Sequence, residues 1–232
     1  MPPDTDIEVT QSPYQALLDA VVAAAAEPVL QIGSLASTLD QSPKNWRSRF
    51  AGKTFVGMDA TAGANVDIVA DIAAPPDELR AKLDGRSFGA IICAHVLEHV
   101  RQPWLACKNI ESLLRPNGVL FVQSPWVQGF HGYPNDYWRF SLAGLQAMFP
   151  AIELIDWSYS GGSSDYVYRV VADSKPVTGG LLADIERDLL QIVLSPTANA
   201  AFLKGAGRPK INLSRGYMPV CVINLLGRKV RA

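Results

Sequence analysis

Short apolar segments recur between residues 28 and 124, and residues that favour turns separate them. Each segment is apolar at nearly every position rather than at every second one, which is typical of parallel strands covered on both faces of a sheet. The pattern therefore predicts buried strands at residues 28–33, 54–59, 66–72, 88–94 and 118–124.

Helical patterns occupy several of the gaps between these strands. Proline is tolerated at the first helical position, because its missing N–H would have no partner there, so it marks where a helix begins. The alternation predicts βαβ units and a doubly wound, mostly parallel α/β sheet. The expected helices run from Pro13 to the Glu27-Pro28 pair, over residues 76–83, and from Pro103 to the Pro116-Asn117-Gly118 turn.

The signal weakens after residue 150, where strand-like runs lie at 152–157, 166–172 and 219–226. These runs are short and apolar like the strands predicted before them, so we interpret them as the end of the same sheet. The chain is therefore expected to be a single domain over residues 1–232.

One segment of this last part, residues 174–216, has a different pattern. Its helical stretch repeats apolar residues at spacings of three and four, and Gly-rich sequences flank it on both sides. We expect a helical insertion that covers the substrate mouth or contacts a partner, including a second copy of the chain in a homodimer. Packing on its own domain is the alternative.

Composition narrows the class of protein. Hydrophobic residues make up 48% and charged residues 19% of the 232 residues, which is ordinary for a globular protein with a core. The net charge of −1 provides no broad attraction to nucleic acid or to an anionic membrane. A small-molecule partner is therefore favoured over nucleic acid.

The cysteines and the N-terminus indicate a compartment. Cys93, Cys107 and Cys221 are widely spaced in apolar segments, which is typical of reduced core thiols rather than a disulfide framework. The N-terminus lacks the basic-then-apolar pattern of a signal peptide. No apolar run approaches the roughly 20 residues of a membrane span. We therefore expect a soluble, cytoplasmic protein.

A metal-binding spacing occurs in the stretch CAHVLEHV, where His95, Glu98 and His99 form H-x-x-E-H. On a continuous helix this spacing holds zinc beside a glutamate base. Here the residues before it are predicted as a strand, so the motif straddles a strand end and a loop. The remaining histidine, His131, would need carboxylates to complete a conventional site. A metalloprotease is therefore rejected, and no metal is predicted.

The same position suits a different ligand, because open α/β sheets bind ligands outside the carboxyl ends of their strands. Asp59, at the end of the second strand, can accept both ribose hydroxyls of an adenosine. Asp71 is placed to meet an adenine amino group. Together these strand ends favour a nucleoside-containing cofactor.

A series of motifs resembles the class I S-adenosylmethionine-dependent methyltransferases. It comprises VLQIGS, FVGMDATAGANVDIVADI, FGAIICAHVLEHV, LLRPNGVLFVQSPW and HGYPNDYWRFS, and it covers about residues 28–150. The chain looks most like a bacterial branch in which an HGxPxDYWRF segment follows the fifth strand. The resemblance implies a Rossmann-like sheet of seven strands, the last of them antiparallel, and transfer of the methyl group of S-adenosyl-L-methionine.

The resemblance also implies cofactor contacts at the strand ends. The loop after the first strand would pass the methionine part, the acid after the second would bind the ribose, and the next two segments would contact the adenine and flank the sulfonium. Carried over one by one, the positions are Gln31, Gly33 and Ser34, then Asp59, then Asp71 and Ile72, then Ala94 and His95.

The loop after the first strand departs from the family pattern. Gln31 stands where the family usually has an acid, and QIGSLAS lacks a G-x-G. Glutamine can bond an ammonium group but brings no charge. The missing glycine argues against a nicotinamide dehydrogenase, whose loop must let a pyrophosphate approach. It leaves open a degenerate methyltransferase fold that binds a ligand or partner without catalysis.

The segment GFHGYPNDYWRFS is expected to lie over the methyl donor. Core packing is the alternative for Trp138 and Phe140, and Arg139 could pair with Asp136 to fix the loop. Charged groups are rarely buried unpaired, so the polar members favour substrate binding. The predicted substrate-binding residues are Tyr133, Asp136, Tyr137, Trp138 and Arg139.

A hydroxyl acceptor would need a base, and imidazole is the natural one near neutral pH. We favour His131, with His99 as the second candidate; His99 could instead hold the loop together with Glu98. The branch that the chain resembles is associated with bacterial surface glycans. The predicted activity is therefore O-methylation of a sugar or another small hydroxylated metabolite.

Overall fold

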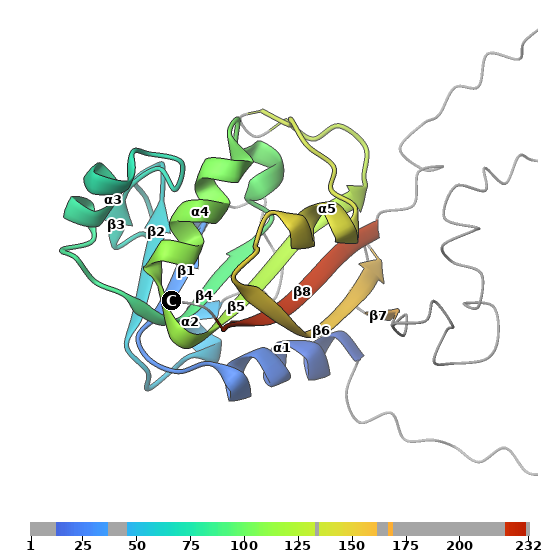
Figure 1. The fold of residues 1–232 in the computed structure, drawn as a ribbon, viewed down its shortest axis with the longest axis horizontal. Coiled ribbons are helices and arrows are strands. Elements are labelled where there is room, and N and C mark those ends of the chain that lie inside the picture. The colour runs from blue at the N-terminus through green and yellow to red at the C-terminus, as the bar shows by residue number, and fades with distance from the viewer. Residues whose placement is uncertain (1–12, 37–45, 133–134, 162–166, 169–220, 231–232) are drawn as a thin grey trace, which may run out of the picture.

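The computed structural model describes residues 13–36, 46–132, 135–161, 167–168 and 221–230. They form one mixed sheet with helices on both faces (Figure 1). The strands are β1 (Val29–Ile32), β2 (Phe55–Asp59), β3 (Ile68–Val69), β4 (Phe88–Ala94), β5 (Leu114–Val127), β6 (Ile152–Gly161), β7 (Val167–Tyr168) and β8 (Cys221–Lys229). The helices are α1 (Pro13–Ala24), α2 (Trp46–Arg49), α3 (Pro76–Lys82), the 3-10 turn η1 (Leu97–His99), α4 (Pro103–Leu113) and α5 (Leu142–Ala147).

The strand order is β3-β2-β1-β4-β5-β8-β6-β7. Strands β1 to β5 pair in parallel, and β8 runs antiparallel to both of its neighbours, β5 and β6. The chain winds outward from β1 to β3 and then returns to β4 beside β1, which is the doubly wound arrangement. The predicted fold class is confirmed, and the two-residue β7 extends the expected seven strands at the β6 edge.

Both faces of the sheet are covered, which explains why the strands are apolar throughout. In β4, Phe88, Ile91 and Cys93 pack in the cluster that contains residues of α3, α4 and α5. The intervening Ala90 and Ile92 pack with α1 and α2 on the opposite face. Successive side chains of a strand point to opposite faces, so burial on both sides removes the polar alternation.

Several element boundaries differ from those predicted. The third strand is only two residues long, and β5 begins directly after α4 rather than after a turn. Phe88 pairs with Leu114 while Ala90 pairs with Val119, so the expected turn residues form an irregularity within the range of β5. The register shift accommodates Asn117, which has a φ of 62°. Helices α2 and α5 were not predicted, because four and six residues are too few to establish a helical period.

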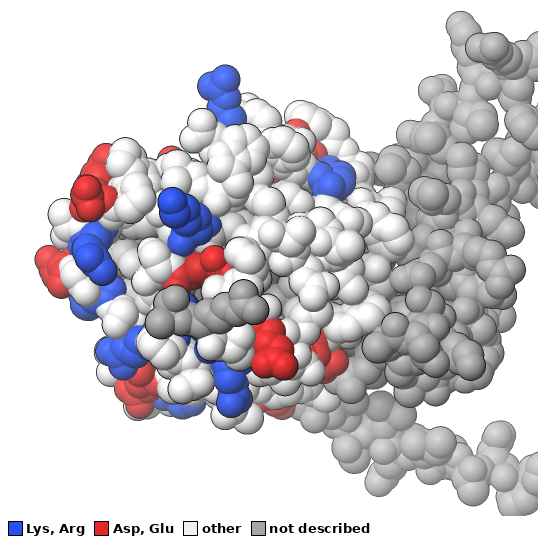
Figure 2. Space-filling view, viewed as in Figure 1, with Lys and Arg blue, Asp and Glu red and all other residues white. Residues whose placement is uncertain are grey.

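The predicted insertion at 174–216 lies outside the described residues. Within the described ranges, no helix has the length and apolar character that a membrane crossing requires. On the face shown in Figure 2, basic and acidic side chains of the described chain are interspersed, as the net charge of −1 would suggest.

Candidate functional site

The predicted cofactor residues follow strands that are neighbours in the sheet. Strand β1 lies between β2 and β4, and Ile32 pairs with Met58 on one side and Cys93 on the other. The three strands are parallel, so their carboxyl ends meet at one edge. We call this edge, with the loops that follow β1, β2, β3 and β4, the carboxyl edge.

The loop after β1 requires a glycine. Gly33 has a φ of 73°, a left-handed conformation that L-residues avoid. A Cβ atom placed on it would lie 2.4 Å from Cγ2 of Val96, in the loop after β4. The two loops therefore approach each other closely, and this close approach brings the predicted methionine-binding and sulfonium-flanking segments together.

Two buried polar atoms in this region lack partners among the described residues. They are Oε1 of Gln31 and Oγ of Ser34, and the two residues are 9% and 2% exposed. Nε2 of Gln31 donates a long hydrogen bond to the Gly33 carbonyl at 3.4 Å. A buried acceptor without a donor costs about 1–3 kcal/mol, which a ligand with N–H groups would recover. The ammonium group of a methionine tail is such a donor, so these residues fit the predicted cofactor.

Asp59 connects the loops after β1 and β2. Its Oδ2 accepts from the Leu35 N–H at 3.1 Å, and its Oδ1 accepts from the Thr61 N–H at 3.0 Å. An ionised carboxylate has about four lone-pair sites, so both oxygens keep acceptor capacity. The bonds hold the carboxylate in position and leave it able to accept two ribose hydroxyls.

The predicted adenine segment is held by a residue that sequence reasoning missed. Asn109 of α4 is buried, and its Nδ2 donates to the carbonyls of Ile72 and Ala74 at 2.7 and 2.9 Å. Asp71 itself is exposed, and its Oδ1 accepts from the Ala73 N–H at 2.8 Å. The available signal was a polar residue among the apolar positions of a helix, which usually has a hydrogen-bonding reason.

The H-x-x-E-H motif lies where the sequence predicted, across the end of β4 and the turn η1 rather than on a continuous α-helix. His95 has a φ of 56°, which is uncommon for a residue with a side chain, and its N–H donates to the Gln123 carbonyl at 3.0 Å. This bond joins the end of β4 to β5. Ala94 and His95 are thereby fixed at the carboxyl edge, opposite the Gly33 loop.

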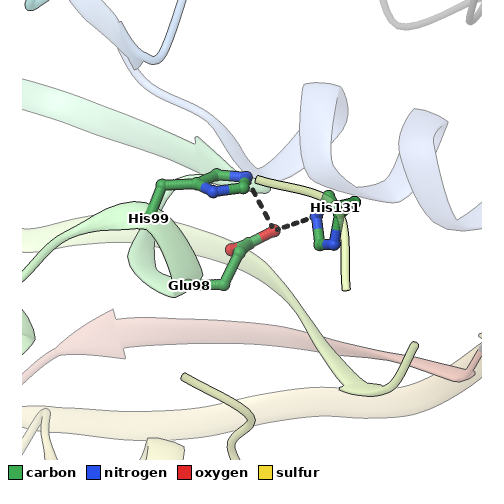
Figure 3. Close-up of side chains that lie close together, drawn as sticks. All are labelled: Glu98, His99 and His131. Carbon is green, nitrogen blue, oxygen red and sulfur yellow. Dashed lines mark ion pairs between the residues drawn. The ribbon is translucent and has the colours of Figure 1, made fainter. Parts of the chain in front are cut away.

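The fold brings His131, from the segment after β5, to Glu98 and His99 (Figure 3). We call these three residues the Glu98 cluster. The carboxylate of Glu98 is fully buried, and its Oε1 lies 3.9 Å from Nε2 of His99 and 4.0 Å from Nε2 of His131. The same oxygen lies 3.5 Å from Nδ1 of His95. Both histidines predicted to be catalytic therefore face one carboxylate oxygen.

Asp136 and Arg139 form the pairing that the sequence suggested. Arg139 donates to both carboxylate oxygens, at 2.5 and 2.7 Å, and also to the Gln128 carbonyl. Hydrogen bonds from Arg139 hold the pKa of Asp136 well below its ordinary range, and Asp136 in turn raises the pKa of Arg139. Oδ2 of Asp136 also accepts from the N–H of His131 at 3.0 Å. Within the described chain, the pair thus positions His131.

Aromatic side chains remain exposed in the segment whose backbone bonds to Glu98, where the Tyr137 and Trp138 N–H groups donate to the Glu98 carbonyl at 2.8 and 3.3 Å. Trp138 is 36% exposed, and its Nε1 donates to the Val100 carbonyl at 2.9 Å. Trp104 of α4 lies edge-on to it, with 6.1 Å between ring centroids, and is 55% exposed. Tyr137 is also exposed, whereas Phe140 is buried, as the core-packing alternative required. Tyr133 lies outside the described residues.

Residues 38–122 match the family model of a methyltransferase domain. This range includes the loops after β2, β3 and β4, and it ends within β5. A comparison with functionally curated proteins gives no match.

Solved structures share the fold at low sequence identity. The N-methyltransferase NodS from Bradyrhizobium japonicum WM9 superposes with a TM-score of 0.50 and 13% identity, covering 94% of each chain. A putative methyltransferase from Bacillus halodurans C-125 has a TM-score of 0.50 and 14% identity, over 93% of this chain and 98% of the other. The [4+2]-cyclase SpnF also matches, with a TM-score of 0.50, 14% identity and coverage of 94% and 81%. These similarities concern the fold, which hosts more than one reaction.

Proposed function

Because residues 38–122 match the model of a methyltransferase domain, we propose that the chain is a class I, S-adenosylmethionine-dependent methyltransferase that methylates a hydroxyl oxygen of a sugar or another small hydroxylated metabolite. One observation carries the choice of oxygen. The Glu98 cluster lies just after β4, at the same edge of the sheet as the cofactor residues, and it offers groups that can remove a hydroxyl proton.

Each predicted cofactor residue would contact a different part of S-adenosyl-L-methionine, the methyl donor. Gln31 and Ser34 would meet the methionine part, Asp59 the ribose, and Asp71 with Ile72 the adenine, while Ala94 and His95 would flank the sulfonium. When bound, S-adenosyl-L-methionine supplies a methyl group on a sulfonium, which is already a good leaving group. The protein's remaining tasks are to align the acceptor and to exclude water.

The hydrogen bonds of His99 and His131 support their proposed role as bases. Nδ1 of His99 lies 2.5 Å from the Asn135 carbonyl, and Nδ1 of His131 lies 3.3 Å from the Gly129 carbonyl. A carbonyl oxygen can only accept, so the hydrogen of each neutral ring sits on Nδ1. Each Nε2 therefore keeps its lone pair. Nε2 of His131 lies 4.0 Å from Oε1 of Glu98 and can accept the hydroxyl proton.

The exposed aromatic rings support a sugar as acceptor. Trp138, Tyr137 and Trp104 are partly exposed, which leaves ring area for a ligand to cover, and the backbone N–H groups of Tyr137 and Trp138 donate to the Glu98 carbonyl. Exposed aromatic residues beside convergent polar groups are typical of small-molecule sites. The net charge of −1 suits a small neutral acceptor better than a nucleic acid, which favours a basic surface.

The test is incubation of the protein with donor carrying a labelled methyl group and with panels of sugars and other hydroxylated metabolites. We expect label in the small-molecule fraction, on oxygen. Label mainly in protein or RNA would refute the proposed acceptor, and label on nitrogen would refute the role of the cluster as a hydroxyl base.

Gln31 favours one alternative, a methyltransferase fold that binds without catalysis, because it replaces a charged group by a neutral one. Calorimetric titration with S-adenosylhomocysteine separates the two functions. Binding below millimolar concentration is expected for the enzyme. If the wild-type protein shows no binding at millimolar ligand, the non-catalytic function replaces the enzymatic one.

A further inference from the structure

The Glu98 cluster has an arrangement that hydrogen bonding within it does not explain. Oε1 of Glu98 is fully buried and has no hydrogen-bond partner among the described residues. Its separations from Nδ1 of His95 and from Nε2 of His99 and of His131, which are 3.5, 3.9 and 4.0 Å, all exceed the 2.7–3.2 Å range of a hydrogen bond. Three groups thus face one another without a direct bond between them.

The hydrogen bonds outside the cluster make these three groups electron donors. Nδ1 of His99 and of His131 point to backbone carbonyls, so their Nε2 atoms turn lone pairs inward. Oε1 of Glu98 adds a carboxylate oxygen. The other carboxylate oxygen, Oε2, accepts from Oγ of Ser124 at 3.4 Å, which orients the group. With these orientations the three groups present one oxygen and two nitrogen lone pairs to a cation placed between them.

We propose that Glu98, His99 and His131 bind one divalent transition-metal cation of the zinc type. Two imidazoles and a carboxylate are a ligand set that suits such a cation and leave a further coordination position open. Binding of the metal is inferred from the geometry of the ligands alone. A catalytic role for the bound metal rests, in addition, on the proposed function. With the cation bound, the open position would take the acceptor hydroxyl and ease loss of its proton to water, while both Nε2 atoms would serve as ligands instead of bases.

The distances permit this assignment with small side-chain movements. One ligand atom from each residue lies within 4.8 Å of the other two. Three atoms so placed surround a point within about 2.8 Å of each, against metal–ligand bonds of about 2.0–2.2 Å. Shifts of about 0.7 Å would close the gap. In a tetrahedral site with such bonds, neighbouring ligand atoms lie about 3.4 Å apart. This separation is closer to the observed 3.9 and 4.0 Å than the donor–acceptor distance of a hydrogen bond is.

The surroundings of the ligands also match those of metal-binding histidines. Such a histidine almost always donates its second ring N–H to a carbonyl or carboxylate, which fixes the ring and its tautomer. His99 has the Asn135 carbonyl in this role, and His131 has the Gly129 carbonyl, with Oδ2 of Asp136 3.4 Å from the same nitrogen. The sequence disfavoured zinc because His131 would need a carboxylate, and Glu98 is the carboxylate that the fold supplies.

The test uses the full chain, freed of metal by a chelator and then titrated with Zn²⁺ by equilibrium dialysis and with Co²⁺ by absorption. We expect one equivalent of either ion and the visible bands of a four- or five-coordinate Co²⁺ site. Mg²⁺ should not compete, because it prefers oxygen ligands. Glu98→Gln and His131→Asn should each weaken Zn²⁺ binding by about 100-fold or more, since even outer partners of metal ligands contribute about 10–100-fold.

Glu111→Gln is the matched control, a glutamate outside the cluster whose Oε1 accepts from the Ala151 N–H. It should bind Zn²⁺ as the wild type does. Binding of S-adenosylhomocysteine by Glu98→Gln would show that this variant is folded, and it separates failure of the metal site from failure of the cofactor site. Absence of stoichiometric Zn²⁺ binding by the wild type overturns the proposal. Equal affinity of the wild type and both ligand variants overturns it too, because the ion would then be held elsewhere.

Discussion

Replacement of Gly33 by alanine tests whether the loops after β1 and β4 meet as closely as described. The substitution adds one methyl group at a φ of 73° and places it 2.4 Å from Cγ2 of Val96. Two separate costs follow, one from the backbone conformation and one from the contact. Both act on the segment predicted to bind the methionine part of the cofactor.

The two costs can be estimated separately. A left-handed conformation costs an L-residue about 1–2 kcal/mol. Crowding a methyl group into a packed site costs about 1–3 kcal/mol, because neighbours must leave their preferred rotamers. Gly33→Ala should therefore lower the free energy of unfolding by about 2–5 kcal/mol.

Gly85→Ala is the control for the backbone cost. Gly85 has a φ of 67°, yet a Cβ atom there would have no heavy atom within 4 Å. Alanine at either position restricts the unfolded chain equally, so that effect cancels in the comparison. Gly85→Ala should cost only the conformational part, about 1–2 kcal/mol.

The contact cost is isolated by a double-mutant cycle with Val96→Ala, which removes the methyl group in the way. Unfolding in urea, followed by circular dichroism, measures all four variants. We expect the double variant to be more stable than additivity predicts by about 1–3 kcal/mol. The reasoning is refuted if Gly33→Ala costs no more than Gly85→Ala, or if the two substitutions are additive.

Three further predictions concern other parts of the site and the core. Asp59→Ala should weaken binding of S-adenosylhomocysteine by about 1.5–3 kcal/mol, the range for bonds to a charged group, and an unchanged affinity in calorimetry would remove Asp59 from the cofactor site. Asn109→Leu should cost about 1–3 kcal/mol for each carbonyl left unpaired, measured by urea unfolding; a cost near zero would mean that these bonds do not hold the adenine segment. Burial raises the pKa of Cys107 to about 12 and that of Cys93 well above its ordinary value, so neither thiol should form thiolate near pH 8. Iodoacetamide should therefore modify them only after unfolding, and rapid labelling of either residue in native protein, located by peptide mass spectrometry, would contradict the described burial.

The sequence by itself determined the sheet and the edge of it at which the predicted cofactor residues gather. Strand β4 was predicted at residues 88–94 and has those bounds, because a run buried on both faces is apolar at every position whatever its partners are. The carboxyl edge followed from the same strands, since parallel strands end on one side. The sequence also predicted that the H-x-x-E-H motif does not lie on a continuous helix, because the apolar residues just before it form a strand.

Only the tertiary structure decided how distant residues meet. His131 reaches Glu98 from the segment after β5, and Asn109 reaches the carbonyls of Ile72 and Ala74 from α4. No local periodicity encodes such contacts, because they depend on how each loop leaves the sheet. The irregularity at the start of β5 has the same origin: Pro116, Asn117 and Gly118 favour a turn locally, yet pairing of Leu114 with Phe88 keeps this stretch beside β4. The left-handed conformation of Asn117, with a φ of 62°, persists as an irregularity between the two paired segments, so the local preference and the long-range pairing are both satisfied.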